Sequence, residues 1–384
     1  MIQNLKLLFS NTQSRVVGMV FAVNSFMFGS WITHLPEIKE KLHISDGTLG
    51  LALLGVPLGS IVAMPFMGWV IHRLGSGKTT WLYGLLFCII SSLPVMASHY
   101  FLFIGALILV GVSTGSMDVA MNAAAAAVEK KSSINIMSGC HGMWSVGGMV
   151  GAAAASLIVG YKISPSLHIL ALAVLFILLL LFLQPVLLSI HDEKPEEVVV
   201  FSLPTGPLIG LAAAGFCIMM GEGAVYDWNA IYLKDTLKAN AFYSGLGYAG
   251  FSMTMAVGRF YGDRLIHDWG ARKMVITGAV ISFTGILIAL VIRQPLVVIA
   301  GFTLAGLGYS CLVPSIYISA SRMPGGSAGS NLAGVAGLGY FGLLAGPPLI
   351  GMIAEHAGLT TALGVVLLLM IIVVGMAGKI RFEK

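Results

Sequence analysis

Ionisable side chains inside apolar stretches are the residues of this sequence best placed to do chemistry. Asp118 and Asn122 are four residues apart, so they share one face of a helix. Glu222 lies between two glycines, with Tyr226 one helical turn further on. A carboxyl group in apolar surroundings, with no Lys or Arg close in sequence, can take up and release a proton near neutral pH. We therefore predict that one of the two, Asp118 or Glu222, is a proton carrier that couples transport to the proton gradient.

Other polar and aromatic side chains of these stretches could bind a solute. His141 is flanked at helical spacing by Ser138 and Ser145, which makes a narrow polar stripe. Indole and phenol rings combine an apolar body with one polar atom. The predicted solute-binding residues are Asn24, Trp31, Asn122, His141, Trp144, Tyr226, Tyr309 and Tyr317. Each also has a plainer interpretation, which is packing or hydrogen bonding between helices.

Membrane-spanning helices are needed to carry these residues. Of the 384 residues 57% are hydrophobic and 10% are charged, whereas about 25% are charged in soluble proteins. Apolar stretches of about twenty residues recur, and each is long enough to cross a membrane as a helix. The predicted spans are 14–34, 46–71, 79–97, 101–125, 137–160, 166–189, 204–232, 241–262, 274–292, 296–320, 328–353 and 359–379.

Lys and Arg are unevenly divided between the loops on the two sides of these spans. With the N-terminus inside, only six of the 21 lie outside, and cytoplasmic loops are the ones enriched in Lys and Arg. The six are Lys39, Lys41, Lys162, Lys234, Lys238 and Arg293. We therefore expect a multi-pass protein of a bacterial inner membrane with both termini cytoplasmic, and we attribute the net charge of +5 to topology rather than to nucleic-acid binding.

An internal repeat divides the chain into two halves. The charged segment HDEKPEE at 191–197 predicts a cytoplasmic linker at 191–203, between six-helix bundles at 1–190 and 204–384. A shift of 195 residues places His72, Gly75 and Lys78 on His267, Gly270 and Lys273. The same shift aligns the glycines 50, 55, 111, 139, 142, 147 and 151 with glycines of the second half. Parallel repeats of this kind occur in transporter folds.

The polar candidates do not repeat at this shift. The aligned pairs are Asp118 with Val313, His141 with Ala336, Glu222 with Met27 and Asn24 with Met219. The repeated glycines allow close helix packing. A set of polar groups that does not repeat is what an asymmetric solute would require.

The sequence resembles the major facilitator superfamily over essentially its whole length. The family is marked by a Gly-rich basic loop between spans two and three, repeated between spans eight and nine. These loops read GWVIHRLGSGK at 68–78, with His72 where the family usually has Asp, and GDRLIHDWGARK at 262–273. The resemblance implies a gating role for His72, Gly75, Lys78, Asp263, Arg264, Gly270, Arg272 and Lys273.

Three further stretches resemble a poorly characterised bacterial branch of that superfamily. They are DVAMNAAAAAVE at 118–129, HGMWSVGG at 141–148 and GEGAVYDWNAIYL at 221–233. The resemblance implies an all-α fold of about twelve spans, in which two six-helix bundles related by a pseudo-twofold axis expose a central cavity alternately to each side. Span four lacks the Arg often found in proton-coupled members, and Ala152 of span five stands where drug antiporters carry Pro.

The leading hypothesis is a proton-coupled symporter for a small polar solute, neutral or cationic and possibly sugar-like. The choice of a neutral or cationic solute rests on the absence of Lys and Arg from the middle of every predicted span, because anionic solutes are usually bound by such residues. The alternatives are a drug or metabolite exporter of the same fold and, more remotely, a transporter-like sensor or a hydrolase using His141, Ser138 and Asp118. We expect a monomer in the lipid bilayer that is not an enzyme and has no cofactor or metal.

Overall fold

The computed structural model describes residues 8, 9, 11–132, 134, 136–190, 204, 206–324, 328–380 and 382, and these are helical with short connections. The predicted linker at 191–203 lies outside the described residues. Contacts divide the chain into two compact units, residues 1–44 with 52–196 and residues 45–51 with 197–384.

The first helices, in chain order, are α2 (Thr12–Thr33), α3 (Leu35–Leu42), α4 (Asp46–Leu53), α5 (Gly55–Leu74), α6 (Ser76–Ile90), α7 (Leu93–Met96), α8 (Tyr100–Ser132), α9 (Met137–Gly160) and α10 (Pro165–Leu188). The second group comprises α11 (Leu208–Ile231), η1 (Tyr232–Thr236), η2 (Ala241–Tyr243), α12 (Leu246–Trp269), α13 (Ala271–Ile292), α14 (Pro295–Tyr309), α15 (Leu312–Ser321), α16 (Ala328–Ala357) and α17 (Leu359–Ala377).

Eleven helical segments within the described residues are long and apolar enough to cross a membrane, which confirms the all-α membrane fold. The remaining predicted span corresponds to α12, a helix of 24 residues that carries Arg259, Asp263, Arg264 and Asp268. It ends at Trp269 rather than at the predicted residue 262. The prediction ended too early because it treated the charged residues as the start of a loop.

The predicted span ten is two helices rather than one. α14 ends at Tyr309 and α15 begins at Leu312, with Ser310 and Cys311 between them. Pro314 follows at the start of α15 and has no N–H, so it cannot donate to the carbonyl of Ser310, the residue four positions earlier. The break therefore lies at a point where the helical hydrogen-bond ladder loses a donor.

Gly75 and Gly270 end equivalent helices with the same geometry. Their φ angles are 83° and 80°, a left-handed conformation that favours glycine. Gly75 N–H donates to Ile71 at 2.8 Å, and Gly270 N–H donates to Ile266 at 2.9 Å. Each glycine then begins the next helix, α6 or α13. The two basic loops are thus structural repeats as well as sequence repeats.

Close backbone contacts repeat between the halves at the same shift. A Cβ atom on Gly111 of α8 would overlap the carbonyl oxygen of Val56 on α5. A Cβ atom on Gly306 of α14 would likewise overlap the carbonyl oxygen of Phe251 on α12. Both members of the second pair lie 195 residues beyond the first.

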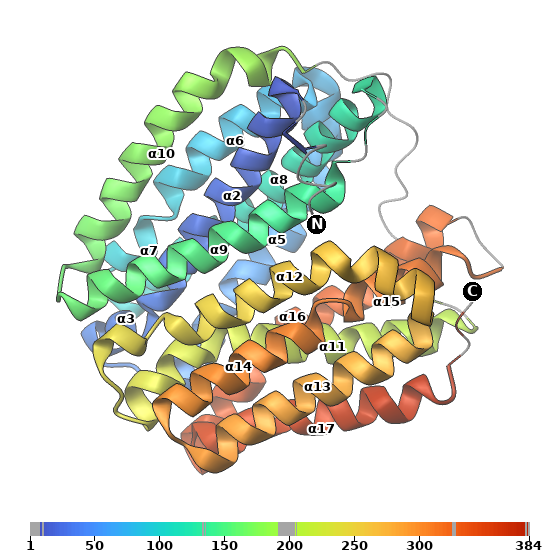
Figure 1. Ribbon diagram of the computed structural model, residues 1–384. Helices are drawn as coiled ribbons and strands as arrows, with labels where there is room; N and C mark the ends of the chain where they lie inside the picture. The colour runs from blue at the N-terminus through green and yellow to red at the C-terminus, as the bar shows by residue number, and fades with distance from the viewer. Residues whose placement is uncertain are drawn as a thin grey trace. The chain divides into compact units, whose positions relative to one another are not determined.

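Figure 1 shows a second repeated pair of helices, α2 beside α9 and α11 beside α16. Gly147 approaches the carbonyl of Ala22, whereas its counterpart Gly342 approaches the carbonyl of Phe216. Ala22 and Phe216 are 194 residues apart. The structural correspondence between α2 and α11 is therefore a shift of 194 residues, one less than the shift of 195 used in the sequence comparison. In this register Glu222 corresponds to Phe28, and the polar group still has no counterpart.

Substitution of Gly111 with Ala should destabilise the protein because the new methyl group must displace the α5 backbone. We expect the free energy of unfolding in detergent to fall by about 1–3 kcal/mol. Gly105 of the same helix is the matched control, since no atom of another helix lies within 4 Å of its Cβ position. The Gly105→Ala variant should unfold at or slightly above the wild-type temperature. Equal melting temperatures for the two variants would contradict the contact.

Candidate functional site

Asp118 and Asn122 form a hydrogen-bonded pair on α8. Asn122 Nδ2 donates to Asp118 Oδ1 at 3.2 Å and to the Asp118 carbonyl at 2.8 Å. Both side chains are half-buried in the N-terminal half. Among the described residues, no Lys, Arg or His forms an ion pair with Asp118. The amide is thus the polar group that meets this carboxyl.

Asn24 of α2 and Trp144 of α9 are in contact in the N-terminal half. Trp144 Nε1 donates to Asn24 Oδ1 at 3.4 Å, and Asn24 is buried. Within the described part of the chain, Asn24 Nδ2 and Trp31 Nε1 are buried without a hydrogen-bond partner. Buried donors are normally satisfied, and these two on α2 are among several buried polar atoms of the described residues that are not.

His141 lies near the start of α9 and contacts α2 through its ring. Its centroid is 5.4 Å from that of Phe21, edge to face. Ser145 Oγ donates to the His141 carbonyl at 3.3 Å. The Ser138 side chain lies outside the described residues. The structure therefore places His141 beside α2, on the same helix as Trp144.

Glu222 is paired with Arg259, and this corrects the expectation that no cation lies inside a span. Arg259 Nη2 of α12 is 3.7 Å from Glu222 Oε1 of α11, with side chains 22% and 13% exposed. α12 continues ten residues beyond Arg259 to Trp269, which is about 15 Å at 1.5 Å per residue. Arg259 therefore lies in the interior of α12, whereas the sequence prediction placed it close to the cytoplasmic loop.

Aromatic rings surround the Glu222 position in the C-terminal half. The Tyr226 ring is 5.0 Å from Tyr248 and 5.1 Å from Phe251, and Phe251 is 5.7 Å from Tyr309. Tyr226 OH donates to Met255 Sδ at 3.2 Å. Tyr248, Phe251 and Met255 were missed from the sequence because each lies in an apolar run with no polar spacing to mark it.

Tyr309 is the last residue of α14, directly before the helix break. Its hydroxyl is buried without a partner among the described residues and lies against Gly221, the neighbour of Glu222. Tyr317 of α15 lies with its hydroxyl 3.9 Å from Met219 Sδ of α11. Both predicted tyrosines therefore face α11.

The basic loop residues lie apart from these clusters, on exposed helix ends. His72, Lys78, Arg264, Arg272 and Lys273 have exposed side chains. Arg272 Nη2 donates to the Gly378 carbonyl after α17 at 2.7 Å, and Lys273 stacks on Trp269. Arg264 pairs with Asp268 at 3.5 Å. The Asp263 side chain lies outside the described residues.

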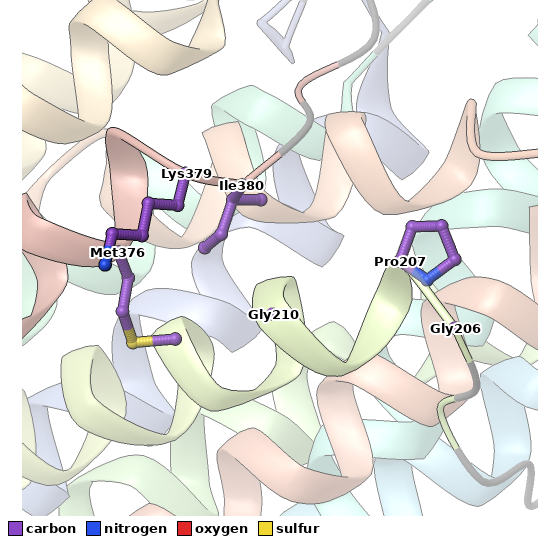
Figure 2. Close-up of a pocket in the computed structure, with 6 residues that line it drawn as sticks. All are labelled: Gly206, Pro207, Gly210, Met376, Lys379 and Ile380. Atoms are coloured by element: carbon purple, nitrogen blue, oxygen red, sulfur yellow. The ribbon is translucent and has the colours of Figure 1, made fainter.

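A cavity of about 430 Å³ lies at one end of the C-terminal half, between α11 and α17. Figure 2 shows Met376, Lys379 and Ile380 opposite Gly206 and Pro207. None of the predicted solute-binding residues lines it. Its walls are mainly apolar side chains and backbone. Lys379 is the one charged residue in its lining, so the cavity lacks the several polar side chains that would bind a polar solute.

The comparisons with known proteins agree on one family. The model of the Major Facilitator Superfamily matches residues 17–209 and 211–383. An uncharacterised MFS-type transporter of Yersinia pestis is 34% identical over 359 residues, covering 94% of this chain and 93% of the relative.

Two solved structures illustrate the shared fold. The nucleoside transporter NupG has a TM-score of 0.75 at 12% identity, covering 96% of this chain and 100% of its own. The E. coli fucose:proton symporter FucP has a TM-score of 0.63 at 15% identity, covering 96% and 98%. At these identities the likeness shows the fold alone.

The Glu222–Arg259 pair should appear as a coupling energy in a double-mutant cycle. Arg259→Met leaves the Glu222 carboxylate in the bilayer without its cation, so we expect unfolding free energy to fall by about 1–3 kcal/mol. Adding Glu222→Gln to that variant should restore part of the loss, giving a coupling of about 0.5–3 kcal/mol. Thermal unfolding of the two single variants and the double variant measures it. Strictly additive effects would mean that the two charges do not interact.

Proposed function

Because this chain belongs to the Major Facilitator Superfamily and is a transporter, we propose that it carries a small polar solute in symport with protons. Transport follows the alternating-access scheme of such folds, in which the binding site is open to one side of the membrane at a time. We place the protein in a bacterial inner membrane as a monomer, with both termini cytoplasmic and no enzymatic activity.

The observation that carries proton coupling is the isolation of Asp118. A carboxylate within a membrane span is costly unless a cation or several donors compensate it. Asp118 has one amide donor, Asn122, and no ion pair among the described residues. Taking up a proton removes the charge, and releasing it restores the charge. Asp118 is accordingly our proposed proton carrier.

Glu222 has a different role in this proposal. Arg259 lies 3.7 Å away, and its positive charge opposes protonation of the carboxylate. We assign Glu222 and Arg259 to holding α11 against α12 near the solute. Of the two carboxyls that the sequence hypothesis offered as the proton carrier, this leaves Asp118.

The solute class follows from the unsatisfied buried polar atoms. In the N-terminal half Asn24 Nδ2 and Trp31 Nε1 are donors, and in the C-terminal half, taken by itself, the Tyr309 hydroxyl can donate or accept. Such groups are complementary to hydroxyl and carbonyl oxygens. Since Arg259 is neutralised by Glu222, a neutral solute rich in these groups, such as a sugar or nucleoside, fits best. NupG is a nucleoside transporter and FucP a fucose:proton symporter, so two proteins of the same fold carry solutes of these classes.

An exporter of apolar compounds is the second candidate. Tyr226 contacts Met255 through its hydroxyl, and Tyr317 contacts Met219. Methionine beside aromatic rings makes an adaptable apolar lining, which a transporter of varied hydrophobic solutes would need. The hydrolase hypothesis has less support, because the amide of Asn122 binds the carboxyl that would have to orient His141.

Thermal unfolding of the detergent-purified protein against a solute panel tests the solute class. A solute that binds the folded state stabilises it by about 2.7 kcal/mol at a hundredfold excess over Kd. We expect a rise in melting temperature with a sugar or nucleoside, reduced in Asn24→Ala and Trp31→Phe. Stabilisation by bulky apolar cations alone would favour the exporter.

Proton movement in proteoliposomes tests the coupling. Addition of a solute identified in this way should make the outside medium more alkaline, because a symporter carries protons inward with it. Asp118→Asn should abolish this pH change and leave the thermal stabilisation by solute in place. Glu355→Gln, at the exposed end of α16, is the matched control and should behave as the wild type. Acidification of the medium would show antiport instead.

A further inference from the structure

Three ionisable side chains form a hydrogen-bonded line at the end of the N-terminal half where α2 ends and α10 begins. His34 Nδ1 lies 2.6 Å from Glu37 Oε2 of α3. His34 Nε2 lies 2.9 Å from His168 Nδ1 of α10. His34 is fully buried, His168 is 8% exposed, and the Glu37 side chain is 24% exposed. The Glu37–His34–His168 line therefore runs from the surface into the helix bundle.

The hydrogen bonds of this line fix where its protons lie. A charged carboxylate only accepts, so His34 Nδ1 must carry a proton and donate it to Glu37. With a neutral His34, Nε2 is then an acceptor, and the proton in the second hydrogen bond belongs to His168 Nδ1. His168 Nε2 remains without a proton. In this state both imidazoles are neutral and the line has a net charge of −1.

One further proton neutralises the line without breaking either hydrogen bond. It comes from water and binds at His168 Nε2 while the proton of His168 Nδ1 passes to His34 Nε2, so that His168 stays neutral. Transfer across the 2.9 Å gap moves the positive charge onto His34, beside the Glu37 carboxylate. Because the three groups are largely buried, a summed charge of zero costs less free energy than a net charge of −1.

We propose that Glu37, His34 and His168 form a second proton-binding site, separate from Asp118. Each residue comes from or adjoins a different helix, namely α3, α2 and α10, so the bound proton strengthens the contact among these three helices. In the orientation under Proposed function this end faces outward, and the site then responds to external pH. Proton binding itself does not depend on that orientation or on transport.

A shared metal ion does not fit this arrangement. Zinc lies about 2.0–2.1 Å from each ligating nitrogen and needs its ligands to converge on one point. Glu37 and His168 contact opposite nitrogens of the His34 ring, so the three groups are in line. A proton is the cation that a linear chain of this kind can hold.

Other ionisable groups lie on the helices and connections around this site. α2 has only Arg15, at its opposite end, and α7 has none. Gly77 of α6 packs against Leu187, which places Lys78 at the far end of α10 from His168. Lys41 donates to the Val95 carbonyl at 3.2 Å. The groups at this end are Lys39, Glu40 and Lys41 of α3, His43 after it, Cys88 of α6, His99 and Tyr100 at the start of α8, and Tyr161 and Lys162 before α10.

Nuclear magnetic resonance of the full chain, labelled with ¹⁵N-histidine in detergent, tests the site by pH titration from about pH 8 to 5. At the alkaline end we expect Nδ1 of both His34 and His168 to carry the proton. As the pH falls, the two sets of signals should change together in one step, because the residues share one proton. His34→Asn and His168→Asn assign the signals.

Glu37→Gln should move that step to lower pH by about one unit or more, since the variant loses the neighbouring negative charge. His356→Gln, at an exposed histidine of the other half, is the control and should leave the step unchanged. Separate steps for the two histidines, or an unchanged step in Glu37→Gln, would overturn the proposal. If Glu37→Gln does not fold, the wild-type spectra decide, because an Nε2-protonated neutral His34 is incompatible with the site. No solute or gradient is used, so a failure of the proposed symport would not affect the result.

Discussion

Helices in a bilayer gain nothing from hiding apolar side chains from lipid, so they must associate through close packing of their backbones. This constraint explains why the same glycine contacts recur in both halves. Gly111 and Gly306 each leave room for a carbonyl oxygen of the neighbouring helix, where any side chain would overlap it. The other structural features depend on this packing, because the polar residues are positioned by helices that meet in this way.

The scaffold is repeated and the polar groups are not. Gly75 and Gly270 end equivalent helices with nearly the same φ angle. In contrast, Asp118 with Asn122 occurs only in the first half, and Glu222 with Arg259 only in the second. The first half thus contains a carboxyl without a cation and the second contains a neutralised pair. Two similar folds have therefore acquired different electrostatic properties.

The sequence was sufficient to predict the helical membrane fold, because the length of the apolar stretches and the spacing of the repeated glycines can be read directly from the order of residues. It was also sufficient to place Asp118 beside Asn122, since four residues are one helical turn. It could not predict that Arg259 reaches Glu222, because the end of α12 was hidden by charged residues within the helix itself. Nor could it predict the His34–His168 contact, since 134 residues separate two histidines that meet through tertiary packing.

The break between α14 and α15 has an electrostatic consequence. Peptide dipoles aligned along a helix place roughly half a negative charge at its C-terminal end. The same alignment places roughly half a positive charge at an N-terminal end. α14 stops at Tyr309 and α15 begins at Leu312, so the negative end of one helix lies next to the positive end of the following helix. These opposite partial charges largely cancel at a distance, and the break therefore adds a short-range dipole to the C-terminal half that no change of pH can remove.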